Sequence, residues 1–350
     1  MELAESKLIH AGLADNTHKT YAAAKKSYQD FCDTFPGRFS KDIPTAEAVA
    51  KWITYLADDQ FKGLSWTTIN TYVSGIKSVM QSAGIDIQFI NEPRINRLMN
   101  GIAHTSGTTA RTTRLPLTSQ IFSIIISQVN SRGNLSYTHY LTLAAMAAGI
   151  YGLMRGGEFV QTNDNQLEDS LLNVGQFKVW FYQSGNSLKE TQIITMKDRM
   201  LTAPFSYPDA ITISLKCAKN DPKKAGTEVR ICDPLGIRMI INYLLLSHPS
   251  LGDKESGLFI NQNGSRFTSA RLVSNMQEYL SQANIPDPRS YTLHSLRKGG
   301  AQSLRDLGAS EEHIQLAGRW NSESAARLYS RQSLSEYIQA SRRISSLSSK

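Results

Sequence analysis

A run of twelve apolar residues, LAAMAAGIYGLM from Leu143 to Met154, constrains this chain more than any other stretch of its sequence. Read as a helix, the run is apolar on every side, and such a helix needs other elements to cover it all round. It is too short to cross a bilayer, which takes about 20 apolar residues. We therefore expect a buried helix over THYLTLAAMAAGIYGLMRGGEFV, residues 138–160.

Two charged residues lie at the end of this apolar helix. Arg155 follows the run directly, and Glu158 comes one turn later. An arginine beside so apolar a segment is costly unless it is paired or presented to a partner. Glu158 is either a structural partner for an arginine or a member of a site, and the sequence leaves both readings open.

The length and patterning predict two domains, because 350 residues exceed one average core. Residues 1–105 carry apolar stripes at helical spacing, which predict three helices and a fourth in INEPRINRLMNGI. Residues 106–117, rich in Thr, Ser and Gly, predict a linker. We expect a second domain over 118–332, and a C-terminal helix with a Ser-rich tail over 333–350.

The second domain mixes helices with a few strands. The strand-like segments are GQFKVWFYQ, AITISLKCAK and TEVRIC, and the turn NDPKKAG makes a hairpin of the last two. Helical segments surround them: TSQIFSIIISQVNS before, and LGIRMIINYLLLS, TSARLVSNMQEYLSQANI, LHSLRKGGAQSLRDLG, SEEHIQLAGRW and SESAARLYSR after. The predicted fold class is mainly α with a small antiparallel β-sheet, as a helical domain followed by a mixed α+β domain.

The charge of the chain favours a polyanionic partner. The formal net charge is +8 and the pI is near 9.3. The excess lies in residues 106–350, where 27 Lys+Arg face 19 Asp+Glu. Such an excess supports attraction to nucleic acid, but an ordinary solvated surface can also produce it.

The cysteines and the N-terminal segment favour an intracellular protein. Cys32, Cys217 and Cys232 are odd in number and lack metal-ligand spacing, so neither a disulfide framework nor a zinc site is expected. No secretory leader and no membrane anchor is expected either.

The segment HSLRKGG, from His294 to Gly300, places an imidazole and a guanidinium three positions apart. Alone, such a pair is common on helix surfaces. Downstream, however, Trp320 lies nine residues before Tyr329. Together with the arginine and acid after the apolar run and a hairpin lysine, this ordered set resembles the tyrosine recombinases, the family of Cre and of phage and transposon integrases. The matching residues are Arg155, Glu158, Lys219, His294, Arg297, Trp320 and Tyr329. The tryptophan and the phrase HSLRKGGAQSL resemble Cre and the eukaryotic crypton-type transposon recombinases more than most bacterial integrases.

The resemblance implies a site-specific DNA recombinase or integrase that inserts or excises a mobile element. GLSWTTINTYVSGIKSV resembles the family's helical core-binding domain, which encircles duplex DNA together with the catalytic domain. Cleavage and rejoining through a 3′-phosphotyrosyl intermediate need no cofactor and no metal. The implied partners are double-stranded DNA with inverted or repeated target sites and further copies of the chain, as a tetramer in the synaptic complex and a monomer or dimer when free. The implied location is the nucleus in a eukaryote, and otherwise the cytoplasm or nucleoid.

The resemblance also assigns a role to each type of residue. Arg155 and Arg297 would clamp the phosphate, because planar guanidinium forks match its oxygens. Tyr329 would be the nucleophile, with His294 as the base that a phenol of pKa near 10 needs. Trp320 would donate to the phosphate or pack beneath the nucleophile, and its alternative is a plain core residue. Tyr329 itself could otherwise be an ordinary half-buried tyrosine.

The lysine that protonates the leaving 5′ oxygen is chosen by strand parity. Odd-numbered residues from Ile211 to Cys217 share one strand face, and Lys219 has the same parity whereas Lys216 has the opposite one. Parity favours Lys219. A kink near the turn would void this choice, and the lysines of this segment could instead form a solvated hairpin.

Several alternatives stay open. A DNA-binding protein whose catalysis has lapsed would keep the fold, and a type IB topoisomerase would share the chemistry. The connection between Glu158 and Lys219 is longer than the family usually has, so residues 161–208 hold an insertion to which the sequence assigns no function. In the tail, Ser333 and Glu336 have capping-box spacing, which predicts a short helix to about Arg343. By resemblance this helix packs on a neighbouring subunit, and the alternative is its own domain.

Overall fold

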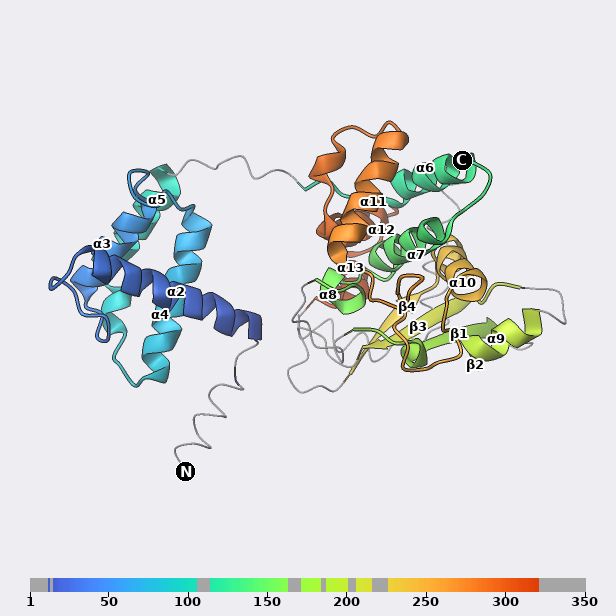
Figure 1. Ribbon diagram of the computed structural model, residues 1–350, viewed down its shortest axis with the longest axis horizontal. Coiled ribbons are helices and arrows are strands. Elements are labelled where there is room, and N and C mark those ends of the chain that lie inside the picture. The colour runs from blue at the N-terminus through green and yellow to red at the C-terminus, as the bar shows by residue number, and fades with distance from the viewer. Residues whose placement is uncertain are drawn as a thin grey trace, which may run out of the picture. The chain divides into compact units, whose positions relative to one another are not determined.

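The structure of the chain is a computed structural model that describes residues 12, 15–105, 114–162, 171–183, 187–200, 206–215 and 226–320 (Figure 1). Its backbone contacts divide the chain into two compact units, Met1–Arg111 and Thr112–Lys350. The division falls inside the segment 106–117 that the sequence predicts as a linker.

The first unit is helical throughout its described part. Its elements are α2 (Asp15–Thr34), α3 (Ala46–Ala57), α4 (Trp66–Ser82), the short 3-10 helix η1 (Gln88–Asn91) and α5 (Pro93–Thr105). Thr45 and Ser65 cap α3 and α4, because their side-chain oxygens accept hydrogen bonds from backbone N–H groups of the first turn. Trp52 is fully buried, with Tyr28 packed edge-on against its ring. The four helices predicted for this region are therefore confirmed.

The second unit is built around one buried helix. Its helices are α6 (Ser119–Asn130), α7 (Tyr137–Tyr151), α8 (Gly156–Phe159), α9 (Ile193–Met200), α10 (Pro234–Leu246), α11 (Ser269–Gln282), α12 (Leu293–Asp306) and α13 (Glu311–Gly318), with short 3-10 helices at Val174–Gln176 and Pro288–Ser290. Every residue of α7 from Leu141 to Ile150 is buried. Helices α10, α11 and α12 pack against α7, as the apolar run predicts.

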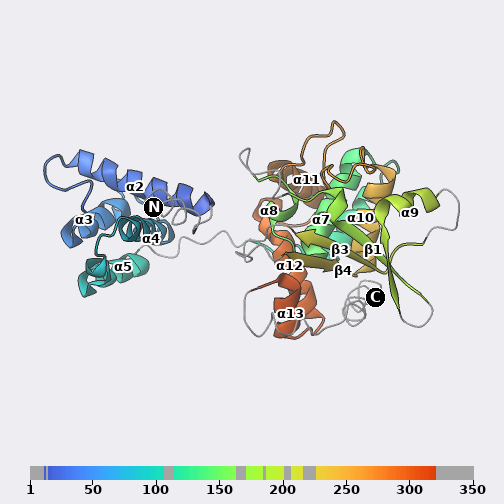
Figure 2. The same ribbon diagram turned by 90° about the horizontal axis from the view of Figure 1, so that it is seen from below.

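A four-stranded antiparallel sheet completes this unit. Its strands are β1 (Phe177–Tyr182), β2 (Leu188–Gln192), β3 (Ala210–Leu215) and β4 (Thr227–Ile231), in the order β2-β1-β3-β4. In the register, Ile211 of β3 lies opposite Val179 of β1 and Ile231 of β4. Buried side chains of the sheet join the same core as α7 and α10, and the sheet lies along one side of these helices (Figure 2). The predicted class, mainly α with a small antiparallel sheet, is confirmed.

The described residues within 161–208 include a strand and an α-helix that the sequence did not predict. Strand β2 adds an edge to the sheet by pairing with β1, and α9 follows it directly. The strand reads LKETQ, and none of its residues is fully buried. An edge strand whose side chains are mostly exposed lacks the apolar alternation on which sequence prediction depends. This part of the chain therefore extends the sheet by one strand.

The helix predicted over residues 138–160 is interrupted. α7 ends at Tyr151, Leu153 adopts a left-handed conformation with φ 42°, and α8 begins with Arg155 as its N-cap residue. A Cβ on Gly152 would lie 2.9 Å from Cγ1 of Val229 on β4, so the chain turns where glycine fits against the sheet. The prediction that Arg155 lies at the end of the buried helix is therefore wrong, because Arg155 lies on the turn between α7 and α8.

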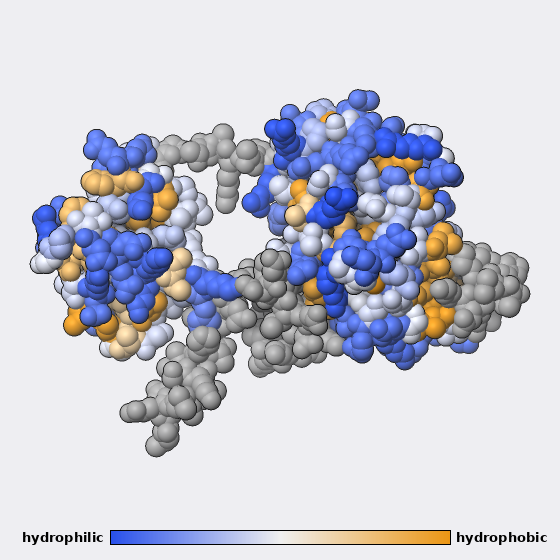
Figure 3. Space-filling model, viewed as in Figure 1, coloured by the Kyte–Doolittle hydropathy of each residue, from blue (hydrophilic) through white to orange (hydrophobic). Residues whose placement is uncertain are grey.

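Hydrophilic side chains cover most of the face of each unit seen in Figure 3, with apolar side chains in scattered patches. Among the described residues, no helix combines the length and apolar character that crossing a membrane requires.

Candidate active site

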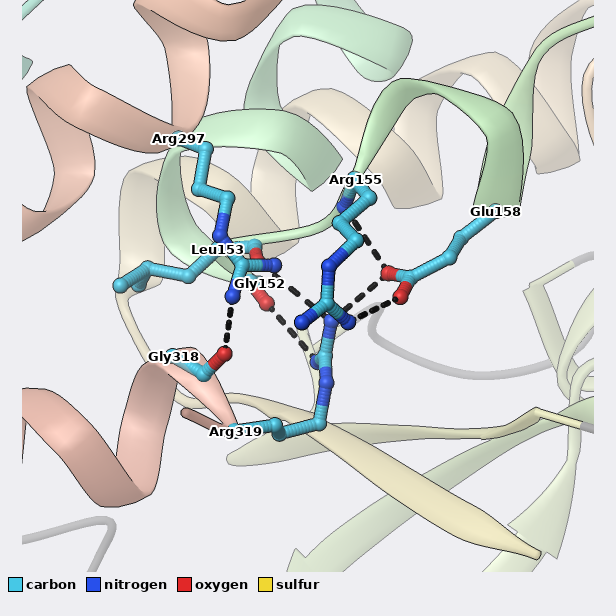
Figure 4. Close-up of polar contacts among 7 residues, drawn as sticks. All are labelled: Gly152, Leu153, Arg155, Glu158, Arg297, Gly318 and Arg319. Atoms are coloured by element: carbon cyan, nitrogen blue, oxygen red, sulfur yellow. Dashed lines mark hydrogen bonds and ion pairs between the residues drawn. The ribbon is translucent and has the colours of Figure 1, made fainter. Parts of the chain in front are cut away.

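Glu158 holds two arginines that come from distant parts of the chain (Figure 4). Its Oε1 accepts a hydrogen bond from Nη1 of Arg155 at 3.1 Å. Its Oε2 accepts from the backbone N–H of Arg155 at 2.9 Å and from Nη2 of Arg319 at 2.7 Å. The side chains of Glu158 and Arg319 are 6% and 8% exposed, whereas that of Arg155 is 24% exposed. Arg155 is therefore the member of this trio most open to a ligand.

Arg297 reaches the same turn from α12. It is 3% exposed, and its Nη1 donates to the carbonyl oxygen of Leu153 at 2.7 Å. Its Nη2 donates to the carbonyl oxygen of Gly318 at the end of α13. Burial, together with the positive charges of Arg155 and Arg319, lowers the pKa of Arg297 to about 10. The guanidinium is still charged at neutral pH, in a place where positive charge is crowded.

Two glycines of HSLRKGG let α12 approach this closely. A Cβ on Gly299 would lie 2.7 Å from the backbone nitrogen of Leu117 and nearer still to its carbonyl group. A Cβ on Gly300 would lie 3.0 Å from the carbonyl carbon of Ile150 and nearer still to its oxygen. Arg297 and Gly300 share a helix face, since they are three residues apart. The two glycines therefore determine how closely α12 packs against α7, and with it the position of Arg297 at the end of α7.

Arg319 is a residue of this cluster that the sequence did not single out. Its guanidinium donates to the carbonyl oxygens of Gly152 at 3.2 Å and Leu153 at 3.4 Å, besides its ion pair with Glu158. Its backbone is left-handed, with φ 54°, at the C-terminal end of α13. This conformation costs a residue other than glycine roughly 1–2 kcal/mol. The signal that could have found Arg319 is its place directly before Trp320.

Trp320 packs within the same cluster. Its ring lies across Gly318, where a Cβ would be 2.6 Å from the ring atom Cη2. The guanidinium carbon of Arg297 lies 4.9 Å from the centroid of the ring, which is within range of a cation–π interaction. The indole thus packs against one face of the Arg297 guanidinium.

His294 lies one turn before Arg297 on α12 and is exposed. Partial burial of its ring, followed by the positive charges of Arg114, Arg297 and Lys298, lowers its pKa below the ordinary value near 6.5. Lys298 also binds the carbonyl oxygen of Arg114 at 2.8 Å, which holds that segment beside α12. The imidazole of His294 is therefore neutral at pH 7 and able to accept a proton.

The electrostatics of the cluster suit an anionic ligand. Arg297 donates to two carbonyl oxygens, which carry no net charge, so these contacts hold its guanidinium without neutralising it. Arg155 shares the carboxylate of Glu158 with Arg319. The partial negative charge at the C-terminal end of α7 helps to hold these cations. A phosphate beside Arg155 and Arg297 would relieve the remaining positive charge.

In the described part of the chain, no three His, Cys, Asp or Glu side chains are placed to share a metal ion.

No protein-family model matches the sequence, and neither does any curated protein. Solved structures do match its fold. The site-specific recombinase XerH, in a post-cleavage complex with palindromic difH substrate, superposes with a TM-score of 0.55 at 15% identity, over 92% of this chain and 78% of that one. The integrase of transposon Tn1549, in complex with transposon right end DNA, superposes with a TM-score of 0.52 at 13% identity, over 94% and 96%. This chain has the tyrosine recombinase fold.

Within the tyrosine recombinase fold, the structure brings five residues of the predicted set to one region. Arg155, Glu158, Arg297 and Trp320 are linked by the contacts above, and His294 lies on the helix of Arg297. The other two, Lys219 and Tyr329, lie outside the described residues. β3 ends at Leu215 and pairs there with the first residue of β4, so the segment that holds Lys219 connects two paired strands. The roles of all seven stay predictions.

Proposed function

We propose that this chain is a site-specific DNA recombinase that cleaves and rejoins DNA through a 3′-phosphotyrosyl intermediate, with Tyr329 as the nucleophile. The observation that carries the proposal is the convergence of Arg155 and Arg297 beside a neutral imidazole, in a chain with the tyrosine recombinase fold. Arg297 keeps its charge in this cluster, and Arg155 keeps its side chain partly open.

The geometry suits attack on a phosphodiester. As the phenolic oxygen of Tyr329 bonds to phosphorus, negative charge grows on the two non-bridging oxygens, and the forks of Arg155 and Arg297 would bind them. Donors arranged in advance for such charge are worth about a hundredfold or more in rate. His294 would take the phenol proton, and Lys219 would give a proton to the 5′ oxygen as its bond to phosphorus breaks. The bond energy stays in the phosphotyrosyl link, so rejoining by a 5′ hydroxyl needs no other energy source.

The same proposal assigns partners. The XerH and Tn1549 integrase structures are complexes with DNA, and the basic excess of this chain lies in residues 106–350. We assign core binding of duplex DNA to residues 1–105 and catalysis to residues 118–332. Recombination of two sites would use four copies of the chain, and insertion or excision of a mobile element is the role we expect.

The test is a covalent trap on nicked duplexes. A pool with randomised sequence, together with any repeats that flank the gene, would be incubated with the protein in EDTA. The reaction would then be denatured in detergent. Cleavage near the nick releases a short fragment, so the intermediate cannot rejoin and accumulates. We expect wild-type protein to form an adduct without metal, because the proposed charge stabilisation comes from arginines.

The matched control is Tyr329→Phe, which removes one oxygen atom. It should bind the selected DNA as wild type does and form no adduct. An adduct that persists in this variant, or that forms only with added magnesium, would refute the proposal.

A further inference from the structure

We propose that Arg319 is a positioning residue for strand cleavage, which ties the end of α13 to the turn that carries Arg155. The inference rests on the proposed function and adds to it a residue outside the predicted set. Arg319 donates to the carbonyl oxygens of Gly152 and Leu153 and to the carboxylate of Glu158. One side chain therefore fixes the residues on both sides of Arg155.

The first effect of Arg319 is on Arg155. Oε2 of Glu158 accepts from Arg319, while Oε1 of the same carboxylate accepts from Arg155. Because two guanidinium groups share one carboxylate, Arg155 is only partly neutralised. Its side chain remains 24% exposed, against 8% for Arg319. Arg319 thus orients Glu158 and leaves Arg155 available for a phosphate.

The second effect is on Trp320 and Arg297. Trp320 follows Arg319 directly, so the anchored guanidinium restrains the backbone from which the indole projects. The indole faces Arg297, and Arg297 donates to the carbonyl oxygen of Gly318, the residue just before Arg319. Leu153 accepts from both arginines, at 2.7 Å from Arg297 and 3.4 Å from Arg319. The side chain of Arg319 and its neighbouring backbone therefore help to position both Arg155 and Arg297.

The backbone conformation of Arg319 also supports a positioning role. Helices commonly end on a left-handed glycine, which adopts this conformation freely. Here an arginine adopts it, with φ 54°. Residues kept in a disfavoured conformation are concentrated at functional sites, where surrounding contacts hold them. A glycine here would avoid the disfavoured conformation but would lose the side chain that contacts Gly152, Leu153 and Glu158.

A guanidinium is needed for this task, because its donors diverge in one plane and reach several acceptors at once. The ammonium of a lysine is a compact point charge and would bind Glu158 without holding the two carbonyl groups. Arg319→Lys therefore keeps the positive charge beside Glu158 and removes the hydrogen bonds to the two carbonyl groups. Arg319→Met removes the charge and keeps much of the volume.

The test is a double-mutant cycle on Arg319 and Glu158. The rate of single-turnover cleavage of the nicked duplex is measured for each variant, and DNA affinity is measured by gel shift. We expect Arg319→Met to slow cleavage by about 10- to 100-fold, because small displacements of clamp groups cost up to about that factor. DNA affinity should change less than about threefold, since the side chain of Arg319 is only 8% exposed. In a Glu158→Gln background the same substitution should add less than about threefold, because coupled residues are not additive. Arg319→Lys should fold and still cleave more slowly than wild type.

The chain offers a matched exposed pair as the control. Arg305 lies 3.4 Å from Glu311, with side chains 52% and 71% exposed. Arg305→Met should leave the cleavage rate unchanged, alone and with Glu311→Gln.

Each contrary result points to a different failure. Wild-type cleavage by folded Arg319→Met or Arg319→Lys would overturn the positioning role, as would effects of Arg319 and Glu158 that simply multiply. Loss of folding in both Arg319 variants would also overturn it, in favour of a purely structural role. A wild-type protein that forms no adduct would instead refute the proposed function itself.

Discussion

Gly300→Ala should displace the phosphate clamp, because the new methyl group has no room. A Cβ at this position would lie 3.0 Å from the carbonyl carbon of Ile150 and closer to its oxygen, whereas ordinary contacts are about 3.5–4.0 Å. Backbone atoms of α7 cannot rotate away as a side chain can. α12 must therefore move outward by about 1 Å, and Arg297, one turn away on the same face, moves with it.

The size of the effect follows from two opposing contributions. Overpacking a core costs about 1–3 kcal/mol, while alanine in a helix is better than glycine by roughly 0.5–1 kcal/mol. The difference spans about 0–2.5 kcal/mol, and because the new methyl group meets backbone atoms we expect a net loss of about 1–2 kcal/mol in the free energy of unfolding. For a unit of the size of Thr112–Lys350, this lowers Tm by about 2–8 °C. A clamp shifted by about 1 Å should slow cleavage by up to about a hundredfold.

Calorimetry and single-turnover cleavage measure the two effects. The control is Gly252→Ala in the same unit, where a Cβ would meet no atom within 4 Å. It should leave both Tm and rate close to wild type. A Gly300→Ala protein with wild-type Tm and cleavage rate would show that the close approach of α12 to α7 does not position Arg297.

Three further predictions concern the chemistry and the assembly. Lys219→Ala should slow cleavage strongly and be rescued by a 5′-bridging phosphorothiolate, whose sulfur leaves without a general acid, whereas Lys216→Ala should be milder. Because the pKa of His294 is lowered, the single-turnover rate should hold below pH 6.5 and fall only as the pH drops through that lowered pKa, where the protonated ring can no longer accept a proton. A chain that ends at Ser333 should bind DNA as a single subunit in gel shifts and form no synaptic complex, because the predicted tail helix would pack on a neighbouring subunit.

Each of these has a contrary outcome. Equal rescue of both lysine variants, or of neither, would remove the reason for choosing Lys219. An acidic fall in rate that survives His294→Gln would assign it to another group. A truncated chain that still recombines two sites would exclude the tail from assembly, and one that does not fold would place the tail on its own domain.

The sequence predicted well those parts of the fold whose signal is local. Apolar spacing located the helices of the first unit and the buried helix α7. Three strands were found because their apolar residues lie in short runs. Strand β2 was missed, since four of its five residues are polar and the strand is defined by its pairing with β1. The break after Tyr151 was missed because it depends on contact between Gly152 and Val229, 77 positions apart in the numbering of the chain.

The site divides in the same way. The resemblance identified five described residues that the fold gathers, because their types and order recur along the chain. Arg319 was not found, although it lies between two residues of that region. Its place in the cluster depends on hydrogen bonds to Gly152, Leu153 and Glu158, which are more than 160 positions away. Contacts across the fold, rather than any local pattern, make it part of the cluster.

The most direct measurement is the identity of the residue that becomes linked to DNA. The trapped adduct would be trimmed with nuclease, digested with trypsin and sequenced by mass spectrometry. We predict a nucleotide joined through its 3′ phosphate to Tyr329, in the peptide LYSR that ends at Arg331. A nucleotide on any other residue, or a 5′ phosphate link to Tyr329, would contradict the proposed chemistry.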